Sequence, residues 1–120
     1  MDIITQSHNG TDIAIIRSDE VLITDVQSAL DLLATVSYQT GTSRMIIPKS
    51  AIIEDFFDLK TRLAGDILQK FINYQMKLAI VGDYSSYTSN SLKDFIYESN
   101  HGKDFFFLAS EEQAIETISR

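Results

Sequence analysis

Few side chains in this sequence have the types and spacing that catalysis requires. The two histidines, His8 and His101, are the imidazoles available as general bases, and both lie in turn sequences. The chain has no cysteine, which excludes a thiolate nucleophile, a disulfide framework and a thiolate metal site. It also has no phosphate-binding loop, no dinucleotide-binding glycine motif and no His or carboxylate cluster at metal-ligand spacing. The sequence therefore predicts no catalytic residue, no metal site and no cofactor.

A polar loop is one candidate binding segment. Residues 83–90 contain no aliphatic side chain, and they include Asp83, Tyr84, Ser86 and Tyr87. Aromatic faces and hydroxyl groups are a common recognition set for small polar ligands. The alternative is a solvated loop with one tyrosine packed down, and the sequence does not distinguish the two.

A second candidate site consists of Asp58, Lys60, Thr61 and Arg62. If a helix begins near Asp58, its free N–H groups attract anions and these residues border the site. If the helix begins at Glu54, the same residues lie one turn inside it and form a solvated face. The Asp58 carboxylate would repel a bound anion, but it would interact favourably with the positive end of the helix dipole, so the second alternative stays open.

The composition fits one domain spanning residues 1–120. Ten Lys and Arg residues against 17 Asp and Glu residues give a net charge of -7, which disfavours nucleic acid or an anionic membrane as the main partner. No apolar stretch approaches the roughly 20 residues of a membrane span, and the first residues lack the pattern of a signal peptide. We therefore expect a cytoplasmic protein.

Residues 56–82 organise the predicted fold. Apolar side chains recur every three or four residues over 56–74, which predicts one amphipathic helix. The apolar run 78–81, closed by Gly82, predicts a central strand buried on both faces. Gly65 lies inside the predicted helix, where glycine costs about 1 kcal/mol relative to alanine, so either a neighbouring backbone approaches closely there or the glycine is merely tolerated.

The chain before this unit predicts a hairpin, a helix and a strand. Asn9-Gly10 is a strong hairpin signal between short segments rich in β-branched residues. Thr24 and Gln27 form a predicted capping box for a helix that begins at residue 25 and ends at Gly41 as a left-handed cap. The segment 44–48, which carries the apolar run 45–47, then predicts a strand that ends at the single proline.

The chain after this unit predicts a helix over 91–99, a strand over 105–108 and a last helix capped by Ser110 with Gln113. This order predicts an α/β fold with a single mixed, mostly parallel central sheet of about five strands and about four helices. The last three strands are expected to be parallel. Their carboxyl ends would then place Lys49, residues 83–90 and the turn after Leu108 at one edge of the sheet. Three phenylalanines in the last strand predict a buried central strand, or an exposed self-association surface if that strand lies at the sheet edge.

Two blocks of the sequence resemble the bacterial family catalogued as domain of unknown function 4180. They are FFDLKTRLAGDILQKFINYQMKLAIVGDY at 56–84 and LKDFIYESNHG at 92–102. This resemblance implies no established activity. The element order also looks like the STAS domain of anti-sigma-factor antagonists, in which partner kinases dock at a phosphorylatable serine. Residues 57–61 occupy the comparable place here, the serine is missing, and Thr61 is the nearest hydroxyl.

Together these observations favour a non-enzymatic, STAS-like regulatory or protein-interaction module. Its predicted recognition edge comprises Lys49, residues 58–62 and residues 83–90. The alternative is a small-molecule-binding domain, and an unrecognised enzyme is the third candidate. The expected partner is a protein or a small polar ligand, and a homodimer is also compatible with the sequence.

Overall fold

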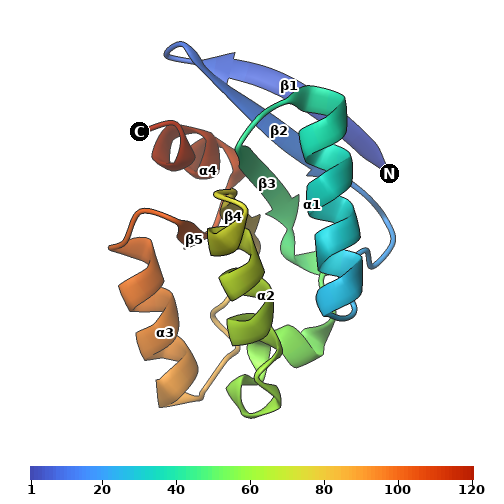
Figure 1. The fold of residues 1–120 in the computed structure, drawn as a ribbon. Helices are drawn as coiled ribbons and strands as arrows, with labels where there is room; N and C mark the ends of the chain where they lie inside the picture. The colour runs from blue at the N-terminus through green and yellow to red at the C-terminus, as the bar shows by residue number, and fades with distance from the viewer.

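The computed structural model describes all 120 residues as one five-stranded sheet with helices on both faces (Figure 1). The strands lie side by side in sequence order, and strands β2 to β5 are parallel to one another. This arrangement confirms the predicted α/β fold with a mixed, mostly parallel sheet. The strands are β1 (Asp2–His8), β2 (Thr11–Arg17), β3 (Arg44–Pro48), β4 (Lys77–Val81) and β5 (Phe105–Leu108).

The predicted hairpin joins β1 and β2 as an antiparallel pair. Asn9 and Gly10 have φ angles of 51° and 78°, the left-handed conformation that a two-residue turn of type I′ requires at both positions. The twist of such a turn matches that of the flanking strands. The asparagine–glycine pair therefore fixes the hairpin register.

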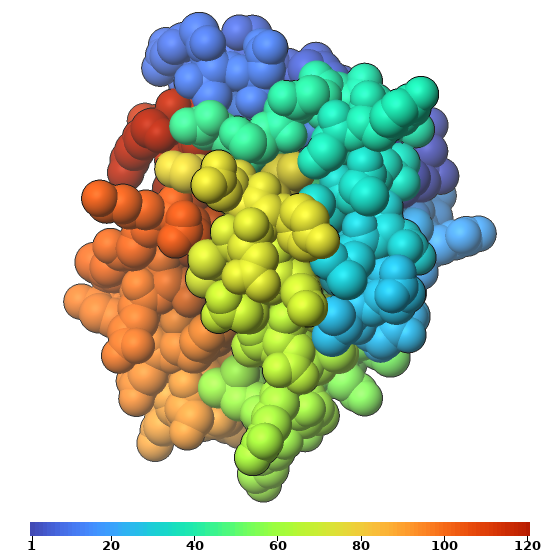
Figure 2. Space-filling view, in the orientation of Figure 1, coloured from blue at the N-terminus to red at the C-terminus, as the bar shows by residue number.

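The helices divide unequally between the two faces of the sheet. Helices α1 (Val26–Thr40), α2 (Leu63–Asn73) and α3 (Asn90–Asn100) cover one face, and α4 (Glu111–Ile118) covers the other. Figure 2 shows α2 packed between α1 and α3 across the first face. Because adjacent strand residues point to opposite faces, Ile46 faces α4 while Met45 and Ile47 face the larger layer.

The predicted helix over 56–74 is wrong in its first third. Two short 3₁₀ helices, η2 (Glu54–Phe57) and η3 (Leu59–Thr61), precede α2, which begins only at Leu63. The Thr61 hydroxyl bonds to the backbone carbonyls of Asp55 and Asp58, both at 2.8 Å, and Arg62 adopts a left-handed φ of 63°. Such side-chain bonds to the backbone compete with a continuous helix, although the apolar spacing continues through the break.

Two predicted local features also differ from the structure. The capping box of α1 is formed by Asp25 and Ser28 instead of Thr24 and Gln27, because the Ser28 amide donates to Oδ1 of Asp25 at 2.8 Å. A Cβ atom at Gly65 would meet nothing within 4 Å, so the expected close approach of a backbone is absent. The left-handed cap of α1 at Gly41 is confirmed by its φ of 69°.

Strand β5 lies at the sheet edge, so the predicted central position is wrong. Both of its faces are nevertheless covered, since Phe106 packs in the α4 layer and Phe107 in the opposite layer. The free edge is occupied by the side-chain amide of Asn100, whose Oδ1 accepts from the Phe107 amide at 2.7 Å and whose Nδ2 donates to the Phe107 carbonyl at 3.1 Å. This amide blocks pairing with another strand at that point, and the phenylalanines form no exposed apolar face.

Candidate functional site

The carboxyl ends of β3 and β4 bring Lys49 and Gly82 into direct contact. Pro48 and Val81 are register partners, so the residue that follows each strand lies at the same edge of the sheet. A Cβ atom at Gly82 would lie 2.5 Å from Cβ of Lys49 and 2.9 Å from its Cδ, distances that side chains do not tolerate. The absence of a side chain at Gly82 therefore lets the Lys49 stem cross the end of β4.

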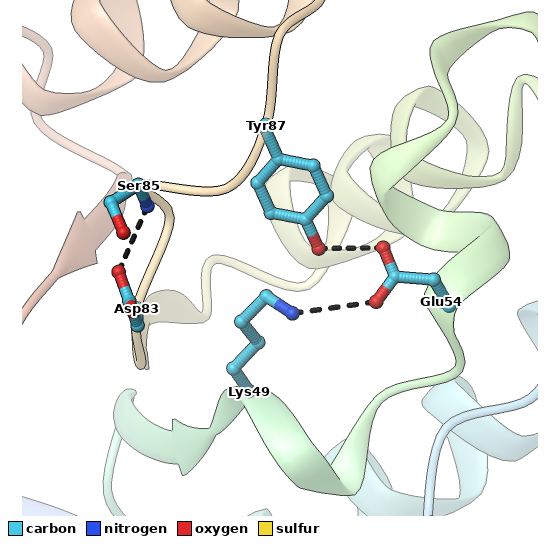
Figure 3. Close-up of polar contacts among 5 residues, drawn as sticks. All are labelled: Lys49, Glu54, Asp83, Ser85 and Tyr87. Carbon is cyan, nitrogen blue, oxygen red and sulfur yellow. Dashed lines mark hydrogen bonds and ion pairs between the residues drawn. The ribbon is translucent and has the colours of Figure 1, made fainter.

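Lys49, Glu54 and Tyr87 form a connected polar group at this edge (Figure 3). The Tyr87 hydroxyl donates to Oε2 of Glu54 at 2.6 Å, and Nζ of Lys49 lies 3.4 Å from Oε1 of the same carboxylate. Nζ also lies 4.7 Å from the ring centre of Phe57 and 5.0 Å from that of Tyr87, within the range of cation–π attraction. Glu54 thus joins the segment after β3 to the loop after β4.

The surroundings hold Lys49 and Tyr87 in their ordinary protonation states at neutral pH. Burial lowers the pKa of the Lys49 ammonium, but the Tyr87 phenol and the Glu54 carboxylate raise it by more, so the pKa lies above its usual value. Burial and the hydrogen bond to Glu54 raise the pKa of Tyr87. Lys49 is therefore a cation and Tyr87 a neutral donor in this group.

The other loop residues have mainly structural contacts. The Ser85 amide donates to Oδ1 of Asp83 at 2.9 Å, and the Ser85 side chain and amide together lower the pKa of Asp83. The Tyr84 hydroxyl donates to the Ile80 carbonyl at 2.8 Å, and its ring packs edge-on against Phe107. Burial, followed by the neighbouring Tyr87, raises the pKa of Tyr84 well above its usual range. Tyr84 is thus the tyrosine that packs down.

An open depression of about 410 Å³ lies beside the polar group. Three carboxylates and four hydroxyl groups border it, and no basic side chain does. It brings together three of the predicted residues, Asp58, Ser86 and Tyr87. The full lining is Glu54, Asp55, Phe57, Asp58, Leu59, Ser86, Tyr87, Thr88, Ser89 and Leu92.

The remaining predicted residues lie outside this depression. Lys60 borders a separate hollow with Asp58 and Ser89. The Thr61 hydroxyl accepts from the Leu63 amide at 3.2 Å in addition to its two bonds to carbonyl oxygens, so it serves the break before α2. Arg62 occupies the left-handed position of that break. Because α2 begins at Leu63, neither of the two helix starts considered from the sequence is formed.

Glu54 and Gly82 are the site residues that sequence reasoning missed. From the sequence, Glu54 is a possible helix start and no site residue, whereas its role depends on the 3₁₀ helix that turns its side chain toward Lys49. Gly82 was read only as the end of a strand, whereas its contact with Lys49 comes from strand register. The carboxylate five residues after Lys49 was the one local signal available.

The fold and the site define a small α/β domain that carries a polar depression at the carboxyl edge of an open sheet. The family model described as "Domain of unknown function (DUF4180)" matches residues 8–118, and the chain belongs to this family. No curated protein and no solved structure matches the chain. The likeness to STAS domains therefore rests on element order alone. None of the helices has the length and apolar character needed to cross a membrane.

Proposed function

We propose that this domain is a non-enzymatic protein-interaction module that binds a basic side chain of a partner protein in the depression at the carboxyl edge of the sheet. The observation that carries the proposal is the pair of carboxylates, Asp55 and Asp58, at its border. Neither takes part in the two ion pairs of the molecule. Of the two cations nearby, Lys49 is already matched by Glu54, and Lys60 borders the adjoining hollow but forms no ion pair with Asp58.

This chemistry suits an arginine or lysine side chain. A guanidinium group donates to carboxylates in a planar, often bidentate geometry, and charge-assisted bonds of this kind are about twice as strong as neutral ones. The hydroxyl groups of Ser86, Thr88 and Ser89 border the same depression and supply further acceptors. The net charge of -7 favours encounter with a basic partner over an acidic one.

The protonation states support binding over catalysis. General acid–base catalysis works best with a pKa near the operating pH, and a lysine nucleophile needs a lowered pKa. At this site the pKa of Lys49 is raised, that of Tyr87 is raised and that of Asp83 is lowered. Each shift favours the form that the group already has at neutral pH.

The shape of the depression supports a macromolecular partner over a small molecule. Six of its ten lining residues are exposed, whereas small-molecule pockets are mostly apolar and enclose most of the ligand. A regulatory role of the STAS kind would be one use of such a module. The depression supports binding of a partner and gives no support to regulation by phosphorylation. The Thr61 hydroxyl, the nearest to the serine position of STAS domains, is already bonded to three backbone groups.

The test is a comparison of two double variants by fluorescence anisotropy with labelled arginine-containing peptides. Asp55→Asn with Asp58→Asn removes the recognition carboxylates. Asp19→Asn with Asp94→Asn makes the same change in net charge at exposed positions outside the depression. Charge-assisted hydrogen bonds contribute about 1.5–3 kcal/mol each, so we expect the first variant to bind at least tenfold more weakly and the second to bind like the natural protein.

Two results would contradict the proposal. Equal weakening in both double variants would show nonspecific attraction to the acidic surface. Equal binding of peptides that carry citrulline in place of arginine would show that charge is not recognised. Native mass spectrometry of protein purified from its own source adds an independent check, because a retained small molecule would favour the ligand-binding alternative.

A further inference from the structure

A second cavity, of about 520 Å³, lies at the opposite edge of the sheet from the acidic depression. Lys77 begins β4, His101 and Lys103 belong to the turn between α3 and β5, and Arg120 follows α4. In Figure 2 the red C-terminal segment and the orange turn after α3 lie on either side of a recess. The full lining is Lys77, Asn100, His101, Gly102, Lys103, Phe106, Thr117 and Arg120.

The charge of this cavity is opposite to that of the molecule. Lys77, Lys103 and Arg120 border it together with His101, and no acidic side chain does. Outside the cavity, seven Lys and Arg residues remain against all 17 Asp and Glu residues. Neither ion pair of the molecule involves the three cations of the cavity. A concentration of unmatched cations in an acidic protein indicates a site for an anion.

The cavity wall contains polar groups that are bonded to the protein and polar groups that can bond to a ligand. Nδ1 of His101 lies 2.8 Å from the Tyr97 carbonyl, so Nδ1 carries a hydrogen, and Nε2, an acceptor in the neutral ring, can accept from a protonated oxygen of a ligand. The His101 ring also packs against the Tyr97 ring, with ring centres 4.2 Å apart and ring planes tilted by 34°, which restricts its orientation. The Thr117 hydroxyl adds a short polar group to the wall. The Asn100 amide gives its oxygen and one N–H to Phe107, which leaves the second N–H of Nδ2 without a protein partner.

The other elements packed around the cavity are held by bonds that do not use its cations. Nε of Arg44 donates to the Ile118 carbonyl at 2.8 Å and fixes the end of α4 beside β3. The Lys77 amide donates to the Ser43 carbonyl at 2.9 Å, which anchors the start of β4 through its backbone. No hydrogen bond to protein atoms involves the side chains of Lys77, Lys103 or Arg120. These three side chains are therefore available to a ligand without loss of structural contacts.

We propose that this cavity binds the phosphate group of a small phosphorylated molecule. Three cations match the two or three negative charges of a phosphate monoester or a diphosphate, and arginine and lysine are the usual phosphate-binding residues. The cavity falls within the roughly 300–1,000 Å³ typical of small-molecule sites, so it has room for more than the phosphate itself. The strongly acidic remainder of the surface disfavours a nucleic-acid backbone as the source of the phosphate.

The test uses inorganic phosphate, pyrophosphate and citrate as probes in amide NMR titrations of the full chain. We expect pyrophosphate to bind with a dissociation constant below about 1 mM and to shift signals at Lys77, residues 100–106 and residues 117–120. The variant with Lys77→Gln and Lys103→Gln is expected to lose at least tenfold in affinity. The matched variant with Lys70→Gln and Lys93→Gln, which removes the same charge outside the cavity, is expected to bind like the natural protein.

Three results would overturn the proposal. These are a dissociation constant for pyrophosphate weaker than about 1 mM, equal weakening in both double variants, and citrate binding as tightly as pyrophosphate. Circular dichroism of each variant establishes that it is folded. If the first double variant is unfolded, the single change Lys103→Gln, at an exposed turn position, carries the same comparison.

Discussion

The contact between Lys49 and Gly82 gives a sharp test of the site geometry. The change Gly82→Ala places a Cβ atom 2.5 Å from Cβ of Lys49, and this neighbour is the rigid base of a side chain instead of its flexible end. The backbone at the end of β3 or β4 must therefore shift. Overpacking of this kind costs about 1–3 kcal/mol, so we expect the free energy of unfolding to fall by that amount.

The assay is urea unfolding of four proteins that form a double-mutant cycle. They are the natural protein, Gly82→Ala, Lys49→Gly and the double variant. Removing Cβ of Lys49 removes the clash, so we expect Gly82→Ala to cost at least about 1 kcal/mol less in the Lys49→Gly background. Lys49→Ala would not serve, because it keeps the clashing atom.

A matched control is available at Gly65, where an added Cβ atom meets nothing within 4 Å. Because glycine costs up to about 1 kcal/mol relative to alanine within a helix, Gly65→Ala is expected to leave stability unchanged or raise it. The reasoning is refuted if Gly82→Ala unfolds at the same urea concentration as the natural protein. It is equally refuted if the cost of Gly82→Ala is the same with and without the Lys49 side chain.

Three further predictions concern the edge strand, the first helix and alkaline pH. Asn100→Ala leaves the Phe107 amide and carbonyl without their partners, so we expect the free energy of unfolding in urea to fall by about 1–3 kcal/mol. An unchanged unfolding midpoint would show that water replaces the side-chain amide. Asp25→Ala removes the N-cap of α1 and is expected to cost about 0.5–2 kcal/mol, while Thr24→Ala, the matched change one residue earlier, should cost less. The pKa of Tyr87 is raised in the folded protein, so the unfolded chain loses this proton first and stability should fall as the pH rises above about 10. Unfolding by urea at several pH values checks this trend, and a smaller fall in Tyr87→Phe than in the natural protein is the expected control result.

Much of the architecture was predictable because local signals agree with the global fold. The Asn9–Gly10 turn, the alternation of apolar runs with helical spacing, and the proline that ends β3 each specify one element. Parallel crossovers then place the ends of β3 and β4 together, which is why Lys49 and Tyr87 could be assigned to one edge before their contact was known.

The differences have identifiable physical causes. Strand order is set by which faces the helices cover, so no local signal placed β5 at the edge. The start of α2 depends on the bonds made by Thr61, which apolar spacing does not register. The basic cavity joins Lys77, Lys103 and Arg120 from three separate segments, and each residue alone is an ordinary surface cation in the sequence. His101 was interpreted as a turn residue, which it is, but the turn also borders this cavity.

The central claim is that the acidic depression recognises a basic side chain. The most direct measurement is an amide NMR titration of the full chain with a short arginine-containing peptide and with its citrulline counterpart. We expect the arginine peptide alone to shift the signals of residues 54–55, 57–59 and 86–89, which border the depression. Shifts elsewhere on the molecule, or equal shifts with both peptides, would contradict it.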